Sequence, residues 1–172
     1  MNNDDTPLEV TAYHEAGHIV VASVLGMALK SEGVTVWEMA QGETFGAASI
    51  CEDERDWERT LIFLRSGVKA QLKQFPQFWT NTTGLSDDCG FFRIVREHFG
   101  DRKNELKERI DLQTDLLLDK HWSAVEAIAQ AVTAGDWKPA EDGGIEAKRK
   151  KQPDGLTLAA ILEKHGIPAV VR

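Results

Sequence analysis

The sequence lacks the features of membrane-bound and secreted proteins. No apolar run in its 172 residues approaches the ~20 residues that a helix needs to cross a bilayer. The segment from Met1 to Asp5 contains neither the basic region nor the apolar region of a signal peptide. We therefore expect a soluble, cytoplasmic protein that makes no contact with a membrane.

Cysteine is scarce. The two cysteines, Cys51 and Cys89, are too few for the disulfide framework of a small secreted domain. Neither belongs to a Cys-x-x-Cys pair of the kind that builds zinc ribbons. We interpret both as reduced thiols, and we expect Cys89 to be a small buried hydrophobic side chain.

Basic residues are also fewer than acidic residues. The 20 Lys and Arg residues are outnumbered by 28 Asp and Glu residues, which gives a formal net charge of −8. Because nucleic-acid binding depends on clustered Lys and Arg, we expect no nucleic-acid partner. The one basic run, residues 148–151, lies in a stretch rich in glycine and proline, so we interpret residues 135–155 as a solvent-exposed loop. A basic interaction patch is the alternative for this run.

The remaining pattern predicts a single, mainly α domain over residues 1–172. A chain of this size buries roughly two-thirds of its unfolded surface, and shares of 42% hydrophobic and 28% charged residues are ordinary for a globular protein. Apolar residues at helical spacing predict helices, and runs of β-branched and aromatic residues predict a hairpin. We expect helices near residues 7–26, 57–74, 86–100, 103–134 and 156–164, a hairpin at 34–39 and 45–50, and a loop at 75–84.

The first predicted helix carries a motif that is typical of metal sites. Thr6 and Glu9 form a capping box at its start. Further along, His14, Glu15 and His18 belong to an HExxH pentad. Chance produces such a pentad in roughly one of a hundred chains of this composition, and its position inside a capped amphipathic helix reduces that risk further.

The spacing of the motif has a physical reason. Residues four apart stand one turn above each other on a helix, so the imidazoles of His14 and His18 can reach one metal ion. Catalytic zinc takes three protein ligands and a water molecule whose pKa falls towards ~7. Glu15 would act as the general base that removes the proton of that water. We therefore expect one zinc ion per chain.

The motif leaves the third zinc ligand open. A metzincin has a glycine and a third histidine at the positions that Val21 and Val24 occupy, so that class is excluded. Spacing does not choose among the other histidine and acidic residues. The candidates include His98, His121, His165, Glu52, Glu54 and Glu58.

Two segments of the chain resemble the peptidase domain of the FtsH-type, ATP-dependent membrane proteases. The segment from Thr11 to Val20 resembles the zinc-site helix of that family. The segment from Thr82 to Asp88 resembles a downstream Thr-Thr-Gly turn of the family, which is followed by an aspartate that binds zinc. The resemblance implies that Asp88 is the third zinc ligand.

The resemblance is looser elsewhere. Residues 34–36 with 45–46 are similar to the family's strand pair, residues 66–70 to its Gly-x-Ala-Ala-Glu helix, and the helix from Lys103 to its C-terminal half. This likeness implies a helical peptidase domain with an HExxH helix and a small β-hairpin. Gln71 replaces an acidic residue of the family, and no Walker motif accompanies the domain. A separate ATPase is therefore a candidate partner.

Together these features favour a zinc metallopeptidase that hydrolyses unfolded proteins or peptides. The predicted strand that contains Val34, Thr35, Val36 and Trp37 is the candidate for binding an extended substrate by strand addition. A plain core-covering hairpin is the alternative for this strand. Two further alternatives are a catalytically idle zinc-binding regulatory module related to FtsH peptidase domains and a binding domain without metal. The sequence leaves homo-oligomer formation open.

Overall fold

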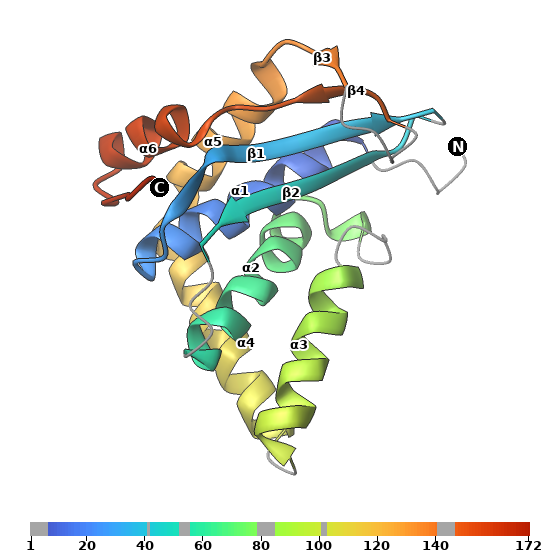
Figure 1. Cartoon of the computed structure of the whole chain (residues 1–172). Coiled ribbons are helices and arrows are strands. Elements are labelled where there is room, and N and C mark those ends of the chain that lie inside the picture. Colours follow the sequence, from blue (N-terminus) through green and yellow to red (C-terminus); the bar gives the residue numbers. More distant parts are fainter. Residues whose placement is uncertain (1–6, 41, 52–55, 79–84, 101–102, 141–146) are drawn as a thin grey trace.

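A computed structural model describes residues 7–40, 42–51, 56–78, 85–100, 103–140 and 147–172 (Figure 1). The elements in these ranges are α1 (Leu8–Val24), β1 (Leu29–Met39), β2 (Thr44–Ile50), α2 (Trp57–Gln74), the 3-10 helix η1 (Pro76–Phe78), α3 (Leu85–His98), α4 (Lys103–Lys120), α5 (Trp122–Ala134), β3 (Lys138–Pro139), β4 (Ala147–Lys151) and α6 (Gly155–Lys164). The fold is mainly α with a small antiparallel sheet, and the predicted fold class is confirmed.

Helix α1 forms the centre of the domain. Every residue from Val10 to Ser23 except Tyr13 is buried. The reason is that β1 and β2 cover one side of the helix while α2 and α5 pack on its other sides. In Figure 1 the strands run across α1, and α2, α3 and α4 extend below it. The sequence predicts one buried face, whereas the structure buries the helix almost all round and places the HExxH side chains inside the domain.

The hairpin of β1 and β2 is part of a larger sheet. The strand order is β2-β1-β4-β3, so β1 is a central strand and β2 is an edge strand. Strands β3 and β4 lie in the stretch predicted as a solvent-exposed loop at 135–155, and that prediction is wrong for both strands. Strand β4 forms backbone hydrogen bonds with the second edge of β1. The sequence does not indicate this non-local pairing, because Lys and Arg have little preference for strands.

The basic run at 148–151 forms contacts within the domain. Lys151 is buried, and its ammonium group donates hydrogen bonds to the carbonyl oxygens of Thr133 and Gly135 at the end of α5. Arg149 forms an ion pair with Glu38 on β1. These contacts attach β4 to the rest of the domain, and they satisfy the buried ammonium group that the strand brings with it.

The long helix predicted over residues 103–134 is in fact two helices. Helix α4 ends at Lys120 and α5 begins at Trp122, because His121 leaves the helical conformation with φ −116° and ψ 22°. The break lets α4 pack on α2 while α5 packs on α1. Apolar residues keep the same spacing on both sides of the break, so the periodicity predicts one continuous helix.

The boundaries of the other predicted helices agree closely with the structure. Helix α2 ends at Gln74 as predicted, and α3 begins next to Ser86. Gly100 follows α3 with a left-handed φ of +53°, which suits glycine at the end of a helix. The predicted cap of α1, Thr6, lies outside the described residues.

The predictions about the two cysteines and about membrane-spanning segments can be compared with the structure. Cys51 and Cys89 are both free thiols. Cys89 is exposed on α3, so its predicted burial is wrong. None of the helices in the described part of the chain is long and apolar enough to span a bilayer.

Candidate metal centre

The crossing of α1 and α2 brings the motif histidines to the partner helix. Gly17 lies at the crossing, where a Cβ atom would stand 2.5 Å from the carbonyl oxygen of Ser66 and 2.6 Å from the Cβ of Ala70. Glycine therefore permits a closer approach than any other residue would. His14 and His18 lie on the same side of α1, and both are buried.

Three ligand atoms converge at this crossing. The Nε2 atom of His14 lies 2.9 Å from Oδ2 of Asp87, and the Nε2 atom of His18 lies 3.1 Å from the same oxygen. The two Nε2 atoms are 3.1 Å apart. Tetrahedral zinc with bonds of ~2.0–2.1 Å would place its ligand atoms ~3.3 Å apart. The three atoms thus need only a small expansion to surround one ion.

The tautomer of each histidine follows from the partner of its other nitrogen. His18 directs Nδ1 at the carbonyl oxygen of Phe63, 2.9 Å away, so Nδ1 carries the proton. His14 directs Nδ1 at Oε1 of Gln71, 3.2 Å away. The orientation of this amide is fixed because Nε2 of Gln71 donates to the carbonyl oxygen of Phe78 at 3.0 Å. Both neutral imidazoles therefore present an Nε2 lone pair.

This arrangement could hold a cation. Two imidazole lone pairs and a carboxylate oxygen face one another with no proton between them when both rings are neutral, and such a cluster is electrostatically unfavourable. When protons on the histidines take the place of a metal ion, burial still raises the pKa of the Asp87 carboxyl, but hydrogen bonds and charge from the two protonated rings outweigh it and hold that pKa well below its usual range. Two imidazoles and one carboxylate are the ligand types that zinc accepts in catalytic sites.

The structure places Asp87, and not Asp88, beside the two histidines, which departs from the prediction that Asp88 is the third ligand. Successive residues of a helix point about 100° apart, and only one of two adjacent aspartates can face the histidines. Asp88 turns instead to Arg65 on α2, with which it forms an ion pair. The Thr-Thr-Gly turn that suggested Asp88, residues 82–84, lies outside the described residues.

The other candidate ligands lie elsewhere. His98 stacks on the ring of Trp57, with ring centroids 4.2 Å apart. His121 is the residue between α4 and α5, and His165 contacts Ser123 through a hydrogen bond. Glu58 pairs with Arg109, and Glu52 and Glu54 lie outside the described residues. In the described part of the chain, His14, His18 and Asp87 are the one group that could hold a metal ion.

Glu15 lies beside the three ligands and is buried, with 3% of its surface exposed. It packs against β2 at Gly46, where a Cβ atom would stand 2.4 Å from its Oε1 atom. Burial, with a smaller contribution from the charge of Asp87, raises the pKa of the Glu15 carboxyl to about 7, although His14 and the backbone amide of Ala48 act against this rise. A carboxyl with such a pKa can both accept and release a proton near neutral pH.

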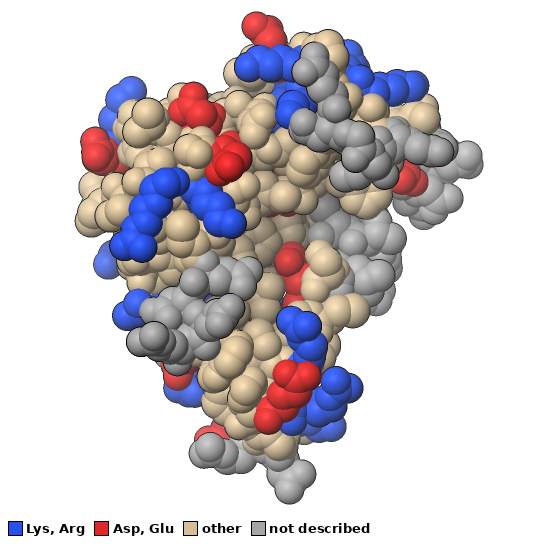
Figure 2. All heavy atoms as spheres, in the orientation of Figure 1, with Lys and Arg blue, Asp and Glu red and all other residues tan. Residues whose placement is uncertain are grey.

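The group opens into a cleft of about 380 Å³. The edge strand β2 lines this cleft through residues 46–50, and Phe63 and Leu64 of α2 also line it. Figure 2 shows the surface hollowed below the strands, with acidic side chains visible near the start of α3. The candidate ligands and Glu15 are therefore reachable from solvent through this cleft.

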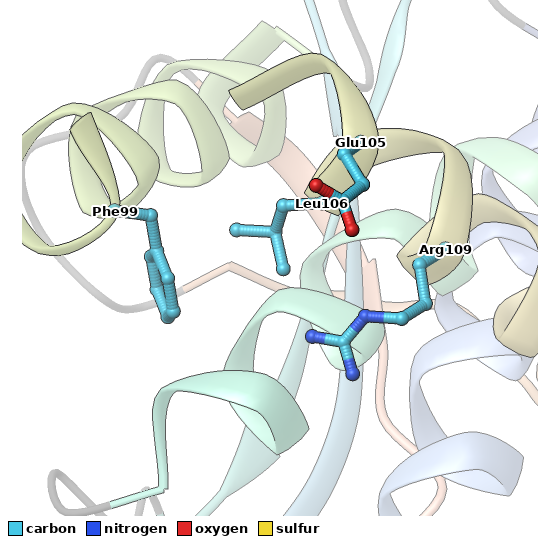
Figure 3. A pocket seen from close by; sticks show the side chains of 4 residues that line it. All are labelled: Phe99, Glu105, Leu106 and Arg109. Atoms are coloured by element: carbon cyan, nitrogen blue, oxygen red, sulfur yellow. The ribbon is translucent and has the colours of Figure 1, made fainter. Parts of the chain in front are cut away.

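A second cavity of about 390 Å³ lies at the opposite end of the helical part. Figure 3 shows the side chains that line it, which are Phe99 after α3 and Glu105, Leu106 and Arg109 on α4. Arg109 also pairs with Glu58 of α2. None of the residues that line this cavity belongs to the metal-ligand group or to the HExxH motif.

The prediction that residues 34–37 bind a substrate by strand addition is wrong, because both edges of their strand, β1, are already occupied. Val34, Thr35, Val36 and Trp37 all pair with β2 on one side. On the other side, Val36 and Trp37 pair with β4, and the amide of Val34 donates to the carbonyl oxygen of Pro153. Strand addition requires an open edge, and β2 is the strand that has one beside the cleft.

Gly67 of α2 is a further residue of the centre that the sequence analysis does not identify. A Cβ atom at this position would stand 2.4 Å from Nε2 of His18 and 2.6 Å from Nε2 of His14. Those two atoms are the proposed metal ligands, so glycine keeps open the space beside them. The only sequence signal was the loose likeness of residues 66–70 to a glycine-containing helix.

Replacing Gly67 by Ala should therefore abolish metal binding or weaken it by more than ~10-fold, as changes that disturb ligand orientation do. The control is Gly90→Ala on α3, because a Cβ atom there meets only Leu64 at 3.4 Å, an ordinary contact. Zinc affinity of both variants can be measured by competition with a chromogenic chelator. Equal affinity of the Gly67→Ala variant and the unmodified protein would contradict this role of Gly67.

Comparisons of the sequence with known proteins found no relative. No protein-family model matches the chain, and no curated protein matches it significantly. What the centre can do therefore follows from its own residues and their contacts.

Proposed function

We propose that this protein is a zinc-dependent peptidase. The observation that carries the proposal is the convergence of His14, His18 and Asp87 beside the buried carboxyl of Glu15. Two histidines and a carboxylate leave a fourth zinc position free, which is the arrangement of catalytic zinc sites. The resemblance of residues 11–20 to the zinc-site helix of FtsH-type peptidases supports the same reading.

Within this proposal each side chain has a separate task. Asp87 and the two histidines hold the zinc ion, which when bound supplies Lewis acidity that polarises a carbonyl group and makes water easier to deprotonate. Glu15 accepts the proton of the attacking water and passes it to the leaving amine. Gln71 and the carbonyl oxygen of Phe63 keep the Nδ1 protons in place, so that both Nε2 atoms remain free to bind metal.

The open edge of β2 is the proposed binding surface for the substrate. Residues 46–50 of this edge line the same cleft as Glu15 and the ligands. The backbone amide of Ala48 already hydrogen bonds to Glu15, which places the strand within reach of the reacting groups. An extended peptide can pair with such an edge through its backbone, with little dependence on its side chains. We therefore propose unfolded proteins and peptides as substrates.

Hydrolysis of an unfolded polypeptide before and after removal of zinc tests the proposal. The zinc-loaded protein should cleave a reduced, carboxymethylated substrate protein, a chelator should abolish the cleavage, and added zinc should restore it. Because the sequence has no phosphate-binding Gly-rich loop with Lys, ATP should leave the rate unchanged. If the zinc-loaded protein cleaves nothing across a broad peptide library, an idle zinc-binding module becomes the better description.

A further inference from the structure

The position of Asp87 depends on how α3 docks against α2. Within the described residues, the hydrogen bonds of Asp87 are those to the two histidines, and no bond from elsewhere orients its carboxylate. Helix α3 packs chiefly on α2. Because Asp87 lies in the first turn of α3, a small rotation or slide of this helix would move its carboxylate away from both Nε2 atoms.

Arg65 of α2 connects the start of α3 to two other helices. Its guanidinium donates through Nη1 to Asp88 on α3 and through Nε to Asp111 on α4, the latter at 2.8 Å. It also lies over the ring of Phe91, a fully buried residue of α3, at 5.4 Å from the centroid. The Arg65 side chain is only 12% exposed and that of Asp111 18%, so their contact is largely shielded from water, whereas Asp88 is 41% exposed and its ion pair with Arg65 is partly solvated.

We propose that Arg65 is a positioning residue that aims Asp87 at the metal by holding its neighbour Asp88. Adjacent helical residues point about 100° apart, so fixing the direction of one aspartate fixes the direction of the other. The planar guanidinium, with its fork of donors, can bind two carboxylates at once in a defined geometry. The inference rests on the metal site of the proposed function, and it deepens that site by adding the device that orients its third ligand.

The contacts of the two aspartates separate this role from a general structural one. Asp111 keeps Lys107 on its own helix and Lys69 on α2, and Lys69 and Lys73 also pair with Asp115 and Asp119, so α4 remains paired with α2 when Arg65 is removed. Asp88 has Arg65 as its one ion-pair partner among the described residues. Loss of Arg65 therefore acts mainly on α3, and through α3 on Asp87.

Arg65→Gln should weaken zinc binding by ~10–100-fold, the range that changes in residues orienting metal ligands produce. Asp88→Asn should have a similar effect, and the double variant should lose no more than either single variant, because both changes break the same contact. Arg65→Lys should lose less, since it keeps the charge without the fork. Lys69→Gln is the matched control. It lies one turn further along α2 and removes ion pairs to Asp111 and Asp115 of α4, but none to α3.

Zinc affinity is measured by chelator competition, and the visible spectrum of the cobalt-substituted protein reports the geometry of the ligands. The melting temperature of the metal-free variants shows whether they fold, and Arg65→Lys carries the test if the Gln variant does not. We expect a changed cobalt spectrum for Arg65→Gln and Asp88→Asn, but not for Lys69→Gln. Equal zinc affinity in Arg65→Gln and Lys69→Gln, or additive losses in the double variant, would overturn the role of Arg65. Failure of the unmodified protein to bind zinc would overturn the metal site itself.

Discussion

Asp87→Asn should remove zinc from the protein, whereas Asp88→Asn should leave it bound. Asparagine keeps the size of the side chain but loses the charge that partners a dication, and we expect the affinity of the Asp87 variant to fall by more than ~10²-fold, beyond the range of changes around the ligands. Asp88 contacts Arg65 and not the histidines, so its variant should weaken binding without abolishing it.

Zinc content after dialysis against buffered free zinc gives the measurement. Both variants should fold, which the melting temperature of the metal-free proteins verifies. The two substitutions are matched because they make the same chemical change at neighbouring positions of one helix. Loss of zinc in Asp88→Asn with full zinc in Asp87→Asn would show that the resemblance to FtsH-type peptidases assigns the ligand correctly and that the observed side-chain geometry does not.

Glu15→Gln should separate chemistry from structure. The change keeps size and polarity while removing the base, so hydrolysis of an unfolded substrate should fall by at least the ~10²-fold that general-base catalysis contributes. Zinc content and melting temperature should hardly move, because Glu15 lies beside the ligands and is not one of them. The Gln side chain can still accept the hydrogen bond from the amide of Ala48.

His14→Ala is the comparison that makes this result informative. That variant loses a ligand, so zinc and hydrolysis should disappear together. The contrast between the two variants is the signature of a base that acts without binding the metal. Unchanged hydrolysis in Glu15→Gln would mean that the activity belongs to another site or to a contaminating protease.

The parts of the fold that depend on local sequence could be predicted. Helix α1, helix α2 and the hairpin of β1 and β2 carry strong spacing signals or β-branched runs, and their boundaries agree with the structure except at the start of β1, which begins at Leu29 and not at Val34. Strand β4 could not be predicted, because its pairing with β1 joins residues more than a hundred positions apart and its own residues, residues 147–151, include a basic run. The break at His121 interrupts no periodicity, so it depends on packing against α1 and α2.

In the candidate metal centre too, the residues that depend on local sequence could be predicted and those that depend on helix packing could not. His14, Glu15 and His18 could be predicted because helix geometry alone brings them together. The choice between Asp87 and Asp88 could not, since it depends on the rotation of α3 about its axis and therefore on Arg65. Gly67 and Gln71 lie on α2 and contact the histidines only through the crossing of two helices, which spacing in one segment does not reveal.

The position of zinc in a crystal of the metal-loaded protein tests the central claim most directly. Anomalous diffraction recorded above and below the zinc absorption edge identifies the ion and locates it. We predict one peak per chain between α1, α2 and α3, at ~2.0–2.2 Å from Nε2 of His14, Nε2 of His18 and a carboxylate oxygen of Asp87. A zinc ion held by other residues, or no zinc at this crossing in protein saturated with the metal, would contradict the account.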